Sequence, residues 1–378
     1  MSKKTFKLDY GILAIVLIFA IISIITIYSA STYISSDMGN LVFKQSIWYL
    51  IGFGGAFLLL KFKNKFLYDH AFLFYVIGCI LLLLLLFFGT PINNSKCWFT
   101  IPGIGSFQPS EFMKIFIMLF LGVMIYNFRK DNDSPTILEE FIFILKTFVM
   151  VLIPSILTFL QPDTGAVIIY LVIYFSMMFA SGIRLRWFVI AFLIVALILG
   201  GIIGLYLVNS DLFIDIFGTK LFYRLDRIFQ WQDGTGLQLE NALAAIGSAG
   251  FFGHGFNKTP IYFPESGTDF IFAVFASNFG FLGASLLILL ICFFDIKLIL
   301  LVRRKKSITD KLVLTGIIGM LLFQQIQNIG MTIGLFPITG ITLPFISYGG
   351  SSLLSYMVMV GIILNISGEK ERGKTYSY

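Results

Sequence analysis

The chain has few charged residues for its length. Only 12% of its 378 residues are Asp, Glu, Lys or Arg, whereas 58% are hydrophobic. A soluble protein carries about twice that share of charge. The scarcity of charge excludes a water-soluble fold, because a core of this size could not enclose so much apolar surface. Most of the chain is therefore expected to lie in lipid.

Cysteine and histidine are also scarce. Of the three cysteines, Cys79, Cys97 and Cys292, only Cys97 lies in a candidate exposed loop, which excludes a disulfide framework. The two histidines, His70 and His254, are too far apart in sequence to predict a histidine metal site. The sequence has neither an internal repeat nor a low-complexity linker, so we expect a single domain over residues 1–378.

Apolar runs of membrane-spanning length are abundant. A hydrocarbon layer of about 30 Å requires roughly 20 apolar residues per helix. We therefore expect an all-α polytopic membrane protein with about ten transmembrane helices. A large extracytoplasmic loop, residues 209–268, separates helices 7 and 8, and its length suggests a functional segment. The expected spans are 9–30, 42–60, 70–89, 109–128, 141–160, 163–182, 187–208, 269–296, 312–335 and 346–366.

Basic residues cluster at alternate ends of these spans. Most of the 27 lysines and arginines flank one set of ends, which the positive-inside rule assigns to the cytoplasm. An even number of spans then places both termini in the cytoplasm and the protein in the cytoplasmic (inner) membrane. This topology explains the net charge of +7, which gives no support to nucleic-acid binding. Within the long loop, charged and aromatic residues alternate, a pattern typical of helices at the membrane surface.

Four polar clusters lie at the outer ends of the expected helices. Ionisable groups at such positions are costly unless they pair or line a cavity. In the first cluster, residues 97–114, Pro109 begins a helix and Ser110 is a candidate cap. Glu111 lies one turn from Lys114 on the same helix face. An internal ion pair and a substrate-binding pair explain these two residues equally well.

The second and third clusters each contain a candidate carboxylate. In QPDTG, residues 161–165, Asp163 is expected to cap a helix, and direct substrate contact is the less favoured alternative. In FPESGTDFIFAVF, residues 263–275, Asp269 lies at the outer mouth of the eighth span. Asp269 is a candidate general base, or a ligand for a divalent cation beside a diphosphate. A carboxylate that the helix dipole stabilises is an equally open alternative.

Glycine and proline mark two irregular segments. The segment AIGSAGFFGHG, residues 245–255, is similar to a phosphate-binding loop but lacks the preceding strand, so a bend or close helix packing is favoured. The fourth polar cluster is PITGITLPFISYGGSS, residues 337–352, with Gln327 and Asn328 in the preceding span. Irregular backbone at membrane depth is stable only beside protein or water, which predicts a cavity open to the outer leaflet.

These motifs resemble those of the SEDS family (shape, elongation, division and sporulation), whose members include RodA, FtsW and SpoVE. The likeness runs across nearly the whole chain in the family's order. It rests on LDYGILAIV, IYSAS, QPSEFMK, QPDTG, YRLDRI, AIGSAG, FPESGTDFIFAV and NIGMTIGLFPITGITLPFISYGGSS. The short tails and the phrase TIPGIGSFQPSEFMK are more similar to the RodA branch than to the FtsW branch.

The resemblance implies a peptidoglycan glycosyltransferase. Such an enzyme polymerises lipid II, the undecaprenyl diphosphate-linked disaccharide pentapeptide, into glycan strands at the outer face of the cytoplasmic membrane. Its role is cell elongation and shape, or division or sporulation, and its partner is a class B penicillin-binding protein. The family's essential acidic residue falls on Asp269, which would activate the acceptor hydroxyl with or without a divalent cation, Mg²⁺ or Mn²⁺.

The resemblance also implies a set of substrate-binding residues. Cationic side chains in and near the long loop are expected to neutralise the diphosphate leaving group. These cations are Arg224, which the resemblance implies, and Arg227 and Lys258, which are expected from their charge and their position in the loop. The other expected substrate-binding residues are Trp98, Glu111, Lys114, Gln161, Asp163 and Ser347.

The sequence departs from the family pattern at three sites, one of which is WQDG at residues 231–234, where Asp-Pro is typical of the family. Cys97 precedes Trp98 where the family has Arg-Trp, which removes a cation that Lys96 could replace. Ser277 and Asn278 stand where the family has paired glutamates. These departures leave the fold prediction intact and weaken the carry-over of catalytic detail.

Two alternatives stand beside polymerisation. A lipid II flippase would need sites that are reachable from both faces, often with ionisable groups at the midplane and repeat symmetry. Here the polar clusters lie on one side, which favours an enzyme. A non-enzymatic scaffold that recruits a transpeptidase would leave the costly polar cavity unexplained.

Overall fold

A computed structural model describes residues 8–31, 38–92, 95–101, 105–132, 134–219, 221–222 and 237–368. Within these residues, a long helix lies at each of the ten expected spans. Nine of them are long and apolar enough to cross a membrane, and α7 has 17 residues. The all-α polytopic fold is confirmed. The helices are α1 (Tyr10–Ser31), α2 (Met38–Leu59), α4 (Ala71–Phe88), α5 (Pro109–Asp131), α6 (Ile137–Leu160), α7 (Thr164–Ala180), α8 (Arg186–Val208), α12 (Ile271–Arg304), α13 (Ile308–Thr332) and α14 (Gly350–Gly368).

Shorter elements connect these helices. They are α3 (Asn64–Asp69), α9 (Ser210–Phe217), α11 (Leu237–Ser248), β1 (Thr90–Ile92), β2 (Ser95–Ile101) and β3 (Gly105–Phe107). The three strands form an antiparallel sheet in the order β1-β2-β3, between the end of α4 and the start of α5. The sequence analysis did not predict this sheet. We call the end of the bundle that carries it the strand-bearing end.

The centre of the bundle is formed by α5, α13 and α14, which have the largest buried share of the long helices. Small residues allow close helix contacts there, as expected inside membranes. At Gly361 of α14, for example, an added Cβ would lie 3.2 Å from the main chain of Ala56 in α2. The outer faces carry large apolar side chains, including Phe192 at 71% exposure and Leu197 at 78%. These faces are suited to contact with lipid.

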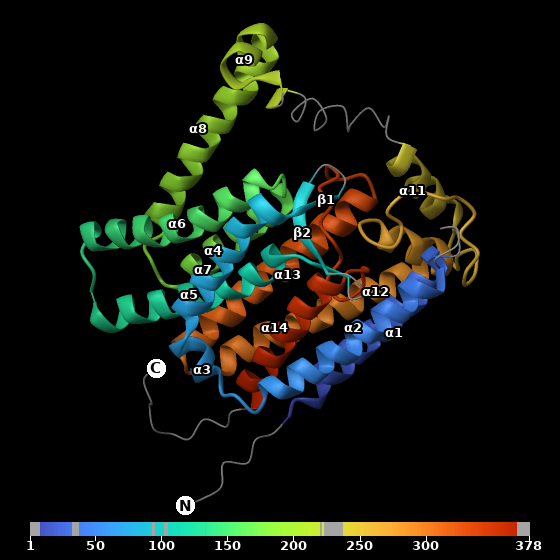
Figure 1. Cartoon of the computed structure of the whole chain (residues 1–378), viewed down its shortest axis with the longest axis horizontal. Coiled ribbons are helices and arrows are strands. Elements are labelled where there is room, and N and C mark those ends of the chain that lie inside the picture. Colours follow the sequence, from blue (N-terminus) through green and yellow to red (C-terminus); the bar gives the residue numbers. More distant parts are fainter. Residues whose placement is uncertain are drawn as a thin grey trace, which may run out of the picture.

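Helix α8 lies apart from the rest of the bundle. No residue of α8 is buried, and Figure 1 shows it leading away from the other helices to α9. Helix α9 is one of the helices expected in the long loop. Lys220 and residues 223–236, which include Arg224 and Arg227, lie outside the described residues.

Helix α12 is broken at Gly280, which has a φ of 64° and a ψ of −165°. The main chain freed by this break binds the glycine-rich segment, because the amide of Phe281 donates to the carbonyl of Gly250. At Gly253, an added Cβ would lie 2.3 Å from the carbonyl oxygen of Asn278. The glycines therefore allow two backbones to touch, and the packing interpretation of residues 245–255 is confirmed.

Candidate functional site

Asp163 connects the starts of α5 and α7. One carboxylate oxygen accepts a hydrogen bond of 3.0 Å from the amide of Ala166, so Asp163 caps α7 as predicted. The other accepts from Gln108 Nε2 at 3.0 Å and Ser110 Oγ at 3.2 Å. The prediction that Ser110 caps α5 is wrong, since Gln108 holds the cap position and its side chain makes no cap bond. Burial raises the pKa of Asp163 above its ordinary value.

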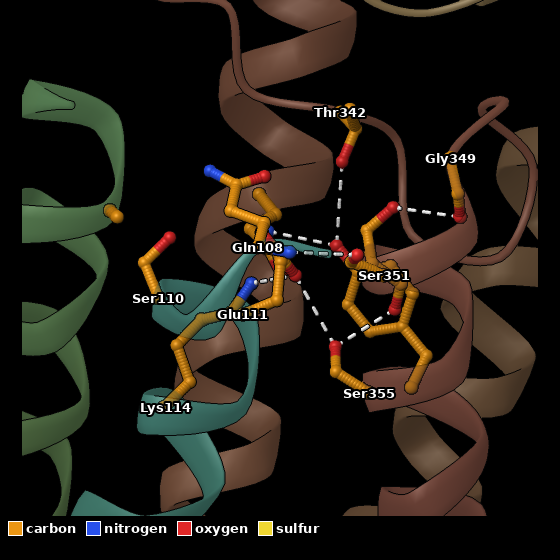
Figure 2. A network of polar contacts seen from close by, with 12 residues as sticks. Gln108, Ser110, Glu111, Lys114, Thr342, Gly349, Ser351 and Ser355 are labelled. Carbon is orange, nitrogen blue, oxygen red and sulfur yellow. Dashed lines mark hydrogen bonds and ion pairs between the residues drawn. The ribbon is translucent and has the colours of Figure 1, made fainter. Parts of the chain in front are cut away.

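Glu111 and Lys114 form an ion pair inside the bundle. The distance from Lys114 Nζ to Glu111 Oε2 is 2.6 Å, and the Lys114 side chain has no exposed surface. Figure 2 shows Glu111 pointing from α5 toward Ser355 of α14, whose hydroxyl donates to Glu111 Oε2 at 3.3 Å. The Lys114 ammonium also lies 5.5 Å from the centre of the Tyr356 ring. This geometry favours the internal ion pair, and direct substrate contact by either residue stays a prediction.

The first and fourth polar clusters are bonded to each other. The backbone N–H of Gln108 donates to Ser351 Oγ at 3.0 Å, and Ser351 Oγ donates to the backbone carbonyl of Ser106 at 3.1 Å. Figure 2 shows Gln108 and Ser351 facing each other between α5 and the start of α14. These bonds fix the irregular start of α14 against β3 and α5.

The turn before α7 is hydrogen-bonded to strand β2. Gln161 is 1% exposed, and Cys97 Sγ donates to its carbonyl at 2.9 Å. Burial and the charge of Asp163 raise the pKa of the Cys97 thiol to about 12. Cys97 therefore faces inward, while Lys96 is exposed and Trp98 is half-buried. Substrate contact by Trp98 and Gln161, and replacement of the missing cation by Lys96, stay predictions.

Asp269 lies in a tight turn, two residues before α12 begins. Glu265 has a φ of 55°, and its carbonyl accepts hydrogen bonds from the amides of Thr268 at 3.2 Å and Phe270 at 3.1 Å. Burial, followed by the negative charge of Glu265, raises the pKa of Asp269 to about 7. In the described part of the chain, no group donates a hydrogen bond to the Asp269 carboxylate, and α12 has no side-chain cap. The carboxylate is thus free for chemistry.

The main chain beside Asp269 is fastened to the fourth cluster. Ser347 Oγ donates to the carbonyl of Thr268 at 2.6 Å, and the amide of Tyr348 donates to the carbonyl of Gly267 at 2.9 Å. Ser347 is 5% exposed. Its observed contact is therefore with the turn that carries Asp269, and its expected contact with substrate is not tested by this geometry.

The second and third polar clusters both lie beside residues 339–341 of the fourth cluster. A Cβ added at Gly340 would lie 3.5 Å from Asp269 Oδ2. A Cβ added at Gly165 would lie 3.2 Å from the Ile341 side chain and 3.5 Å from the carbonyl oxygen of Thr339. All four polar clusters therefore meet at the strand-bearing end, as the sequence analysis expected.

The sequence analysis grouped Asn328 of α13 with the fourth cluster but gave it no role at the site, and the structure shows that it contacts the turn at Asp269. Its Nδ2 donates to the carbonyls of Asp269 and Ile341, both at 2.8 Å, and its side chain is fully buried. The sequence feature that could have indicated a role for Asn328 is its polar carboxamide within an apolar span. That feature was ambiguous, because Gln324, Gln325 and Gln327 lie in the same span.

The two neutral residues in place of the family's glutamates are buried and bonded. Asn278 Nδ2 donates to Ser29 Oγ at 2.7 Å, and Asn278 Oδ1 accepts from Thr259 Oγ1 at 3.0 Å. His254 Nδ1 lies within hydrogen-bond distance of two Ser277 atoms, the carbonyl oxygen at 3.1 Å and the hydroxyl oxygen at 3.2 Å. Ser277 and Asn278 of α12 therefore connect this helix to the long loop, and Asn278 also connects it to α1.

The remaining predicted residues are placed as follows. Lys258 is exposed on the long loop, whereas Arg224 and Arg227 lie outside the described residues. Over the parts of the chain that the structure describes, no group of three or more His, Cys, Asp or Glu side chains is arranged to hold a metal ion. Asp269 and Glu265 therefore do not complete a metal site by themselves.

The fold and the site define a polytopic membrane protein with a partly buried polar site at one end of its helix bundle. The model of the FtsW/RodA/SpoVE family, described as cell cycle proteins, matches residues 10–372. The chain belongs to this family, and the resemblance drawn from the motifs is confirmed.

Two relatives with curated names are similar over almost their full length. A probable peptidoglycan glycosyltransferase FtsW of Thiomicrospira cyclica is 32% identical, with 98% of this chain and 94% of the relative covered. The stage V sporulation protein E of Bacillus subtilis is 33% identical, with 97% and 99% covered.

Two solved structures share the fold. One, from work on the coordination of polymerization and crosslinking by a peptidoglycan synthase complex, has a TM-score of 0.79 and 26% identity over 95% of this chain and 97% of that chain. The crystal structure of Thermus thermophilus RodA has a TM-score of 0.69 and 26% identity over 95% and 96%. Because both FtsW and RodA proteins are similar, assignment to the RodA branch stays a prediction.

Proposed function

We propose that this protein is a peptidoglycan glycosyltransferase that polymerises lipid II, and that Asp269 is its general base. The name of the FtsW relative supports the activity. The observation that carries the residue assignment is a half-buried carboxylate with a pKa of about 7 and no hydrogen-bond donor among the described residues. A base with a pKa near neutrality accepts and releases a proton efficiently at physiological pH.

In the proposed step, Asp269 takes the proton of the acceptor sugar hydroxyl. The hydroxyl oxygen bonds to the anomeric carbon of the donor as the bond from that carbon to the diphosphate oxygen breaks. The leaving undecaprenyl diphosphate keeps the electron pair, and nearby cations stabilise its charge. Lys258 is exposed and suited to this role, and Arg224 and Arg227 are the other candidates.

A divalent cation would require ligands beyond Asp269 and Glu265, because the described residues contain no complete metal-binding group. Oxygen atoms of a diphosphate and of water are suitable ligands for Mg²⁺. When bound, the ion would neutralise phosphate charge. The proton transfer and the attack described above depend on the chain's own residues, and the cation stays a prediction.

We also propose that the strand-bearing end faces away from the cytoplasm. The basic residues of the short connections lie at the other end of the bundle, where Lys61, Lys63, Arg129 and Arg184 flank helix ends. The positive-inside rule assigns that end, and with it both termini, to the cytoplasm. A class B penicillin-binding protein is the proposed partner, which the similarity to a peptidoglycan synthase complex supports.

The test is polymerisation of purified lipid II in detergent by Asp269→Asn and by Glu265→Gln, each with and without the partner. General-base loss predicts a rate about 10²- to 10⁴-fold lower for Asp269→Asn. The unfolding temperature should not fall, since the carboxylate accepts no hydrogen bond in the described structure and burial disfavours its charged form. Near-normal polymerisation by Asp269→Asn would remove the base role. Because detergent has no leaflets, polymer formed there also excludes transport or scaffolding as the sole function.

A further inference from the structure

Asn328 uses both hydrogens of its amide on main-chain carbonyls of two separate segments. Asn328 Nδ2 donates to the carbonyl oxygen of Asp269 and to the carbonyl oxygen of Ile341, each at 2.8 Å. A carboxamide nitrogen has only two N–H groups, so its donor capacity is fully used. The side chain has no exposed surface, and Asn328 Oδ1 is buried without a partner among the described residues.

Neither carbonyl belongs to a regular element. Asp269 precedes α12, and Ile341 lies in the irregular segment between α13 and α14. An unpaired carbonyl at membrane depth is costly, so a donor from a neighbouring helix stabilises this backbone. The two bonds also fix how the turn at Asp269 lies against the segment that contains Gly340.

From this geometry we propose that Asn328 is a positioning residue, which holds the main chain of Asp269 so that the free carboxylate points toward Gly340 and the site. The proposal rests on the proposed base role of Asp269. Asn328 touches no reacting atom and acts through Asp269 alone. A displacement of about 1 Å at a catalytic group lowers a rate by about 10²-fold.

Gln327 is a matched control for Asn328. It is the preceding residue of α13, and its Nε2 donates to the carbonyl of Pro337 at 2.9 Å. Gln327 thus makes the same kind of bond, from the same helix, to the same irregular segment. Among the described residues, it makes no hydrogen bond to the turn at Asp269.

The experiment compares Asn328→Ala, Asn328→Gln and Gln327→Ala in detergent. Unfolding temperature, kcat and KM for lipid II, and amide hydrogen exchange at Phe270 are measured for each. Positioning predicts that kcat falls about 10- to 100-fold in both Asn328 variants, with KM unchanged and faster exchange at Phe270. Gln327→Ala should keep kcat within about twofold, because its bond does not reach Asp269.

A merely structural role predicts a different pattern. Activity would then fall only with the fraction of folded protein, and to a similar extent in Asn328→Ala and Gln327→Ala. That result, or a change in KM alone, would overturn the proposal. If Asn328→Ala does not fold, Asn328→Gln decides, since it retains both N–H donors and changes only their position. A folded Asn328→Gln with normal kcat also overturns it.

Asp269→Asn, measured in the same series, separates this proposal from the base role. An active Asp269→Asn removes the base, while exchange at Phe270 still reports whether Asn328 fastens the turn. An inactive Asp269→Asn together with normal Asn328 variants removes only the positioning role.

Discussion

The hydroxyl of Ser347 donates a hydrogen bond of 2.6 Å to the carbonyl of Thr268, the residue before Asp269. The same Ser347 oxygen accepts a bond of 2.9 Å from the amide of Leu343. Ser347 therefore closes its own turn and holds a turn that lies 79 residues away in sequence. The turn before Asp269 and the irregular segment before α14 are thus joined by hydrogen bonds through Ser347.

Ser347→Ala should lower both stability and turnover. It leaves the carbonyl of Thr268 and the amide of Leu343 without this partner, and a buried unpaired group costs about 1–3 kcal/mol. The measurements are thermal unfolding and lipid II polymerisation per folded protein. Ser352→Ala is the control, since in the described part of the chain Ser352 Oγ bonds only the carbonyl of Gly349, within its own turn. Equal effects of the two substitutions would contradict the link to Asp269.

The activity should increase with pH through the neutral range. The pKa of Asp269 is raised to about 7 by burial and by Glu265, so below pH 7 the carboxyl is protonated and cannot act as a base. Above that pH it is ionised, and kcat/KM should reach a plateau. Glu265→Gln removes a negative charge that raises this pKa, so its profile should have a lower midpoint. Profiles of kcat/KM against pH measure both effects, and a wild-type profile that is flat through pH 7 would contradict the assignment.

The helices could be predicted because apolar runs of the required length depend only on local sequence. The break in α12 could not, since residues 269–296 have the length and overall hydropathy of one span. The break depends on the contact between Gly253 and the main chain around Gly280, which lie 27 residues apart. The last helix was expected from residue 346 and begins at Gly350, because the backbone amide of Tyr348 donates to the carbonyl of Gly267 in another segment.

The candidate site was predicted at the level of clusters, and its bonds were not. Local rules identified the cap at Asp163 and the pair of Glu111 with Lys114, which are contacts within one turn. The bond from Ser110 to Asp163 crosses 53 residues, so local rules wrongly made Ser110 a helix cap. The partners of Asn328 could not be predicted for the same reason, since they are 59 and 13 residues away.

Gly340→Ala should lower kcat more than its effect on stability explains. The φ of Gly340 is +71°, where a residue with a Cβ costs about 1–3 kcal/mol, and the new Cβ would contact Asp269 Oδ2. Gly334→Ala is the matched control: its φ is +78°, but its Cβ would contact Leu243. Both variants should lose similar stability in thermal unfolding. If kcat per folded molecule falls equally in both, contact with Asp269 is not the cause.

Cys97 should resist alkylation in the folded protein. Its side chain is 2% exposed, its thiol donates to the carbonyl of Gln161, and its pKa is raised to about 12. The reactive thiolate is therefore scarce, and the reagent has no access. Mass spectrometry after treatment with iodoacetamide should find Cys97 unmodified until the protein is unfolded in detergent. The control is Lys96→Cys, in which the exposed neighbour should react rapidly; equal rates at the two positions would contradict the inward orientation of Cys97.

Glu111 and Lys114 should tolerate joint replacement better than single replacement. Lys114→Met leaves Glu111 without its counter-ion, and Glu111→Gln leaves the fully buried Lys114 without its own. Removal of one partner of a buried pair costs about 3–5 kcal/mol, whereas neutral replacement of both is often tolerated. The double variant Glu111→Gln/Lys114→Met should therefore unfold near the wild-type temperature, and it should polymerise lipid II, because Lys114 has no exposed surface for substrate. A stable double variant without activity would show instead that the pair acts on substrate, after a movement that opens α5 from α14.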